Sequence, residues 1–295
     1  MTKRIFLFVL TNILVVATIS ITLELIQSFT GYRIDPSSYT GLLIFCSVFG
    51  FGGAFISLMI SKWMAKRMTG LKIIDPVNPQ PQARDVLNIV YAAARKAGLE
   101  KMPEVGIYDS PEVNAFATGP SRNNSLVAVS TGLMNRMNRE ELEGVLGHEV
   151  AHIANGDMVT MTLIQGVVNT FVMFFARIIA SIISSNLDEK ARGVAHFAIV
   201  IVLDIVLSLL GSMVVAYFSR AREFRADAGG ARLTGKHKMI AALKRLQTQT
   251  GMIDESQEAL ATLKISNRHR GGLAALISTH PDLSVRIAAL ERASV

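Results

Sequence analysis

Two histidines and a glutamate lie close together in the sequence HEVAH, where His148, Glu149 and His152 form the first part of a candidate metal site. On an α-helix, residues four positions apart lie on the same face, so both imidazoles can reach one ion while Glu149 lies beside it. This combination is typical of hydrolytic zinc sites. The alternative is an amphipathic helix with incidental histidines, so the rest of the chain must support the interpretation.

A third ligand is needed, because a catalytic zinc ion usually takes three protein ligands and keeps a fourth position open. Glu223 in SRAREFRAD is the expected ligand, since it follows two apolar helices that return the chain to where it left. We expect Asp227, one turn further on, to accept a hydrogen bond from a ligand histidine and fix its tautomer. Asp157 could also support the site, although the helix end at Gly156 explains this residue adequately.

These residue types imply a mechanism for peptide hydrolysis. Glu149 would accept a proton from the attacking water and give it to the departing amine, while the metal polarises the peptide carbonyl. His280 in STHPDLSVRI is a candidate for a further donor that stabilises the negatively charged oxygen. In the alternative interpretation, His280 lies in a turn before the last helix and Arg286 lies on a solvated face of that helix.

The composition indicates a membrane protein. Of the 295 residues, 50% are hydrophobic and 18% are charged, and the mean hydropathy is +0.38, which is unusual for a soluble domain of this length. Four apolar stretches are long enough to cross a hydrocarbon core of about 30 Å; they are residues 5–23, 40–60, 158–183 and 193–217. We therefore predict a mainly α membrane protein with four membrane-length helices and a small β-sheet.

Four segments follow from this pattern. Residues 1–61 form an N-terminal transmembrane hairpin, and 62–157 form a cytosolic catalytic region that carries the HEVAH helix. Residues 158–217 form a second transmembrane or membrane-associated hairpin, and 218–295 form a C-terminal catalytic region with the third zinc ligand.

Basic residues predict the orientation. Lys3 and Arg4 precede the first apolar stretch, and a cluster of basic residues follows the second, so both termini and the HEVAH segment should be cytosolic. This bias and attraction to anionic lipid explain the net charge of +7, and no nucleic-acid-binding module is evident. Cys46 is the only cysteine, which excludes a disulfide framework and a thiolate metal site.

Local patterns predict the elements around the site. The segment PQARDVLNIVYAAARKAGLE is predicted to form an amphipathic helix that ends at Gly98. Short β-like runs follow at 104–108, 113–118 and 125–130. Asn138 can cap the HEVAH helix, which should end near Gly156. Within the apolar hairpin, Arg177 and Asp204 are ionisable groups that we expect to pair or to reach water.

The motifs NAFATG, HEVAH, EFRAD and THP with RI occur in this order, and they resemble those of the HtpX-type membrane heat-shock proteases of the M48 zinc metallopeptidase family. The resemblance implies a zincin-like (gluzincin) catalytic domain with one Zn²⁺ ion, on the cytosolic side of the bacterial cytoplasmic membrane. It also implies an endopeptidase of the stress response that removes misfolded or damaged membrane proteins.

Residue roles also follow from the resemblance. It implies that the zinc ligands are His148, His152 and Glu223, that Glu149 is catalytic and that Asp227 supports the site. The resemblance further implies that an edge strand holds the substrate, which makes Asn114, Ala115 and Phe116 substrate-binding candidates. An exposed edge strand can bind an extended peptide through backbone hydrogen bonds.

Two other functions compete with this interpretation. An intramembrane protease would carry its histidines within an apolar stretch, whereas the HEVAH segment is amphipathic and charged. A non-catalytic zinc-dependent scaffold or transporter would use a structural site, which usually has four protein ligands that commonly include cysteine. The sequence disfavours both.

Overall fold

The chain forms two compact units in a computed structural model. The described residues are 20–21, 23–25, 27–29, 31, 35, 37–249 and 276–294. The expected first apolar stretch, 5–23, lies almost entirely outside these residues, as does the segment 251–272, to which no motif could be assigned. One unit, here called the helical unit, comprises Met1–Ser57 and Met161–Val215, and the mixed unit comprises Leu58–Thr160 and Ala216–Val295.

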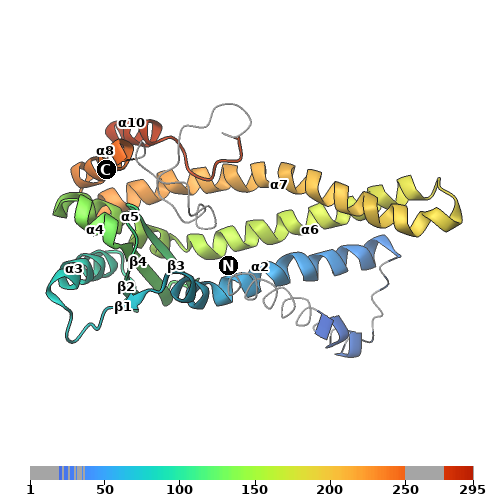
Figure 1. Cartoon of the computed structure of the whole chain (residues 1–295), viewed down its shortest axis with the longest axis horizontal. Coiled ribbons are helices and arrows are strands. Elements are labelled where there is room, and N and C mark those ends of the chain that lie inside the picture. The colour runs from blue at the N-terminus through green and yellow to red at the C-terminus, as the bar shows by residue number, and fades with distance from the viewer. Residues whose placement is uncertain are drawn as a thin grey trace. The chain divides into compact units, whose positions relative to one another are not determined.

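Long apolar helices make up the helical unit. They are α2 (Tyr39–Thr69), α6 (Asp157–Ser184) and α7 (Glu189–Thr234) (Figure 1). One end of each of these helices belongs to the mixed unit. Within the described part of the chain, these three helices are long and apolar enough to cross a membrane. Small residues allow them to pack closely, because a Cβ added to Gly50 of α2 would lie 2.5 Å from the hydroxyl oxygen of Thr170.

A four-stranded sheet lies in the mixed unit. Its strands are β1 (Lys72–Ile73), β2 (Glu104–Tyr108), β3 (Ala115–Ser121) and β4 (Asn124–Ser130). The spatial order is β1-β2-β4-β3, with β2 and β4 parallel and both other pairs antiparallel. The expected small sheet is therefore confirmed, although β3 begins two residues later than predicted and the short strand β1 was not predicted. β3 forms one edge of the sheet.

Amphipathic helices complete the mixed unit, some of them packed against the sheet and others against those helices (Figure 1). They are α3 (Pro81–Lys96), α4 (Thr131–Arg136), α5 (Arg139–Asn155), α8 (Lys236–Gln249) and α10 (Leu283–Arg292). One hydrophobic core joins them, in which Val90 of α3, Leu146 of α5 and Leu243 of α8 are fully buried. This core fixes the position of α5, which carries HEVAH.

Helix α5 begins and ends where the sequence predicts. The side chain of Asn138 accepts a hydrogen bond from the backbone N–H of Glu141, and the Glu141 carboxylate accepts one from the backbone N–H of Asn138. This reciprocal cap satisfies two N–H groups that the helix itself cannot. At the other end, Gly156 adopts φ 71°, a left-handed conformation that glycine accommodates without strain.

Candidate metal centre and active site

Helices α5 and α7 approach each other closely at the site. A Cβ added to Gly230 of α7 would lie 2.9 Å from the backbone nitrogen of His148, so glycine is needed there. Glu223 and Asp227 precede Gly230 by seven and three residues, which places all three on one face of α7. The close approach therefore brings the two carboxylates of α7 to the histidines of α5.

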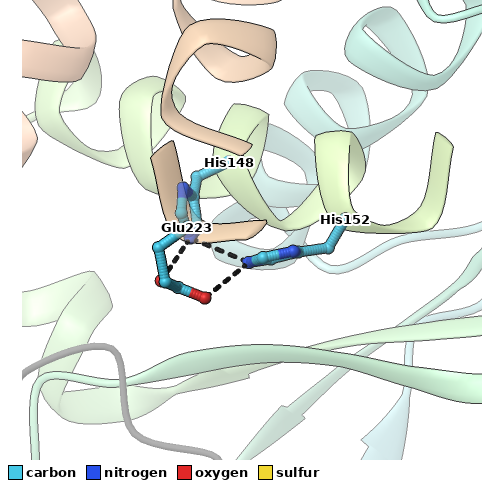
Figure 2. Close-up of side chains that lie close together, drawn as sticks. All are labelled: His148, His152 and Glu223. Carbon is cyan, nitrogen blue, oxygen red and sulfur yellow. Dashed lines mark hydrogen bonds and ion pairs between the residues drawn. The ribbon is translucent and has the colours of Figure 1, made fainter. Parts of the chain in front are cut away.

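Three side chains converge at this contact. His148, His152 and Glu223 point toward one another, and one ligand atom from each lies within 4.8 Å of the other two (Figure 2). The Nε2 atoms of the histidines are 3.0 Å apart, and each lies 3.3 to 3.4 Å from a Glu223 oxygen. All three side chains are buried, so the structure brings the three expected ligands into one group.

The other nitrogen of each imidazole contacts an aspartate. Nδ1 of His148 lies 2.9 Å from Asp227, and Nδ1 of His152 lies 2.6 Å from Asp157. A neutral imidazole that donates from Nδ1 presents a lone pair at Nε2. Two such lone pairs and a carboxylate then face the same point, an arrangement that a cation satisfies. The donor set therefore fits a divalent metal ion.

Charge at the site favours a cation as well. Burial alone would lower the pKa of His148, but the carboxylates of Asp227 and Glu223 raise it to about 9. Burial alone would raise the pKa of Glu223, but His280, His148 and His152 hold it well below its ordinary value. Glu223 is consequently ionised at neutral pH, as a metal ligand must be.

Arg286 is a component of the site that the sequence interpretation missed. Its side chain is 0% exposed, and it donates from Nε and Nη2 to the two oxygens of Asp227 at 2.8 and 2.6 Å. The reading that placed Arg286 on a solvated face is therefore wrong. Its spacing carried a signal, because Arg286 lies three residues after Leu283 and four before Leu290, on the apolar face of α10.

Asp157 also has a larger part than the sequence indicated. It is 2% exposed, and its carboxylate is held against His152 directly after the turn at Gly156. The end of the helix thus explains its position but not its burial or its partner. Asp157 lies five positions after His152, and the tight turn is what brings the two together.

Glu149 lies at a small cavity beside the ligands. The cavity has a volume of about 50 Å³, and besides the three ligands its lining includes Ala115, Phe116, Ala117, Glu149, Arg222 and His280. Burial raises the pKa of Glu149, although the charges of His148 and His152 oppose this and the backbone N–H of Ala117 donates to its carboxylate. Glu149 is therefore held between the ligand helix and the edge strand β3.

His280 is brought to the same cavity. Its Nδ1 lies 3.0 Å from a Glu223 oxygen. Arg220 of α7 holds this segment, because its Nη1 donates to the backbone carbonyls of Leu276 and Ser278. His280 thus lies in the bend before α10, as the alternative interpretation placed it, but its imidazole lies beside the candidate ligand Glu223.

The NAF segment divides into two parts. Ala115 and Phe116 line the cavity, whereas Asn114 does not. The Asn114 side chain is buried and donates to the hydroxyl of Tyr108 at 3.1 Å, and its backbone N–H donates to Ser130. Asn114 therefore holds the start of β3 in place.

Comparison with known proteins identifies relatives along the whole chain. "Protease HtpX homolog" of Bacillus licheniformis is 54% identical over 298 residues, with 99% of each chain covered. "Protease HtpX" of Idiomarina loihiensis is 52% identical over 292 residues, with 98% of this chain and 99% of that protein covered. These relatives confirm the resemblance that the motifs indicated, and they do not favour a non-catalytic scaffold or transporter.

A more distant protein shares the fold. The structure is similar to the crystal structure of Ste24p from S. mikatae, with a TM-score of 0.64 and 16% sequence identity. The similarity covers 98% of this chain and 65% of the other. A model described as peptidase family M48 matches residues 80–294, which include every candidate site residue. The chain therefore belongs to peptidase family M48 and is a membrane-bound zinc metalloprotease.

Proposed function

We propose that His148, His152 and Glu223 bind one zinc ion and that Glu149 is the general base of peptide hydrolysis. The convergence of two imidazole nitrogens and a carboxylate, all buried, is the observation that carries this proposal. A bound zinc ion would polarise the peptide carbonyl and acidify water. Asp227 and Asp157 fix the tautomers of the two histidines through their Nδ1 atoms.

Glu149 moves the proton in this mechanism. It takes a proton from the attacking water and passes it to the departing amine, so it must exchange protons readily. The raised pKa that burial gives its carboxylate suits that task. His280, which lines the same cavity, is positioned to donate to the oxygen on which negative charge develops.

The edge strand β3 is the proposed substrate platform. Ala115 and Phe116 line the cavity, and Ala117 donates its backbone N–H to Glu149. A peptide that pairs with this edge would run directly past the general base. Asn114 contributes by holding the start of the strand. The substrates are extended polypeptides, since backbone pairing reads no particular side chain.

We further propose where the enzyme acts. Residues 1–61 and 158–217 form the membrane part, with four spans, while 62–157 and 218–295 form a catalytic part on the cytosolic side of the bacterial inner membrane. Basic residues at the ends of the apolar stretches support this orientation. Misfolded or damaged membrane proteins then become natural substrates, because their cytosolic loops meet the enzyme at the membrane surface.

The test is the variant Glu149→Gln. Since Glu149 is a base and not a ligand, the detergent-purified variant should retain one zinc ion per chain. Its cleavage of an unfolded protein such as casein should fall by at least about a hundredfold, the lower end expected for loss of a general base. Zinc content and cleavage are measured on the same preparation.

A matched control separates catalysis from folding. Glu140→Gln makes the same chemical change on the exposed first turn of the same helix and should leave both zinc content and cleavage unchanged. Cleavage by Glu149→Gln at the wild-type rate would reject Glu149 as the base.

A further inference from the structure

A cavity in the helical unit shares none of its described lining residues with the metal centre. Its volume is about 630 Å³, within the range of about 300 to 1,000 Å³ that is typical of small-ligand sites. It is lined where α2 begins, where α6 ends and where the first turns of α7 follow. The cavity therefore lies at one end of three membrane-length helices, the level at which lipid headgroups meet acyl chains.

The lining is amphipathic. Its polar side chains are Ser37, Ser38, Tyr39, Ser181, His196 and Arg177. The remaining lining residues are apolar, and two of them, Ile182 and Phe197, are 60% and 68% exposed. None of the described lining residues is acidic. The described lining thus combines the fixed positive charge of Arg177 and several hydroxyls with an apolar wall that continues onto the exposed helix surface.

Arg177 keeps donors available to a ligand. Its Nη1 donates to the carbonyl of Met173 at 3.0 Å, which uses one of five N–H groups, and its guanidinium lies 6.0 Å from the centre of the Phe45 ring. Asp204 is near enough for its charge to interact with that of Arg177, but among the described residues no carboxylate forms an ion pair with Arg177 within 4.0 Å. Arg177 and Asp204 therefore attract each other through their charges but do not form the expected close ion pair.

We propose that this cavity binds the phosphodiester headgroup of an anionic phospholipid. The phosphate lies on Arg177, because a guanidinium donates to phosphate oxygens in parallel pairs. The hydroxyls of Ser181 and Tyr39 complete the polar end, and the acyl chains follow the apolar surface past Phe197. A soluble anion would leave this apolar wall uncovered, which is why a lipid fits better. The proposal is independent of the metal centre.

Lipid retention by the full chain tests this proposal. The detergent-purified, delipidated protein is titrated with phosphatidylglycerol, and native mass spectrometry counts the retained lipid. Wild type should retain one molecule, and Arg177→Gln should need about tenfold more lipid, as expected for the loss of charged hydrogen bonds. Lys190→Gln removes an exposed positive charge from the same hairpin outside the cavity and should bind like wild type.

Two further arms identify the ligand chemistry. Diacylglycerol with the same acyl chains should not be retained, because it lacks the phosphate, and inorganic phosphate should not displace the lipid. Ser181→Trp, which fills the cavity without touching the charge, should lose retention even if Arg177→Gln fails to fold. Equal retention by wild type and both cavity variants, equal retention of diacylglycerol, or displacement by inorganic phosphate would each overturn the proposal.

Discussion

Charged side chains are held differently in the mixed unit and in the helical unit. In the mixed unit, buried Asp227 lies between His148 and Arg286 and contacts both at hydrogen-bond distance. In the helical unit, Asp204 interacts with the charge of Arg177 but forms no ion pair with it within 4.0 Å. An aspartate thus forms close contacts with its charged partners where it orients a ligand, whereas the aspartate among the apolar helices has a charged neighbour without a close contact. The buried charges of the mixed unit are therefore structural components of the site.

The substitution Asp227→Asn should have the largest effect. It removes the nearer of the two carboxylates that pair with fully buried Arg286 and leaves Glu223 at 3.4 Å. Breaking a buried ion pair typically costs about 3 to 5 kcal/mol. The substitution should also weaken zinc binding, because His148 loses the carboxylate on its Nδ1. Thermal unfolding and zinc titration measure the two effects.

Asp204→Asn makes the same change in the helical unit. Because Asp204 forms no ion pair within 4.0 Å with any described residue, its effect on unfolding should stay below about 1 kcal/mol. Equal destabilisation by Asp227→Asn and Asp204→Asn would show that the charged residues of the two units contribute equally to stability.

Asp157→Asn comes next in size. The variant keeps the shape of the side chain but removes the charge that holds Nδ1 of His152, a change that typically weakens metal binding by about 10-fold to 100-fold. Competition with a chelator measures the affinity. Asp188→Asn, in the exposed turn before α7, is the control and should bind zinc as wild type does. Unchanged affinity in Asp157→Asn would mean that the 2.6 Å contact has no part in binding.

Two glycines of α7 lie in different units and should differ in their tolerance of a methyl group. Gly230→Ala forces a methyl group against the backbone of His148 and should cost about 1 to 3 kcal/mol, with loss of casein cleavage. A Cβ at Gly193, in the part of α7 that belongs to the helical unit, meets nothing within 4 Å. Gly193→Ala should therefore leave the melting temperature and cleavage intact, and a similar loss in both variants would contradict the close approach at the site.

The smallest effect concerns pH. Burial alone would raise the pKa of Glu143, but Lys238 and Arg139 lower it below its ordinary value of 4.5. The folded state then binds a proton less readily than the unfolded state, so this stabilisation is present above about pH 4.5 and is lost as pH falls through the lowered pKa. Glu143→Gln should remove up to about 1 kcal/mol of this dependence. Lys238→Met should have a similar effect. If the free energy of unfolding of both variants depended on pH between pH 6 and pH 3 as that of the wild type does, the ion pairs of Glu143 would not contribute to stability.

Much of the arrangement around the metal centre could be predicted from local signals. The cap at Asn138 and the glycine at 156 fix the ends of α5, and the i, i+4 spacing places both histidines on one face. The return of the apolar hairpin was enough to expect Glu223 beside them. Strand β1 escaped prediction because two residues are too short to show a period.

Arg286, which was missed, and Asp157, whose part was underestimated, depend on tertiary contacts. Arg286 is buried because Asp227 and Glu223 of α7 supply its counter-charges, and a charged residue is otherwise expected at the surface. Asp157 meets His152 through the turn at Gly156, a geometry that sequence spacing does not reveal. Both residues take part in contacts between a charge on one element and a ligand on another.

The zinc content of Glu223→Ala shows whether the three buried side chains form a metal site. Three buried side chains are proposed to bind one ion, so the detergent-purified wild type should contain one zinc per chain, and Glu223→Ala should lose it after mild chelation. His237→Ala, which changes a histidine outside the group, should keep it. Retention of one zinc by Glu223→Ala with wild-type affinity would contradict the proposed metal centre.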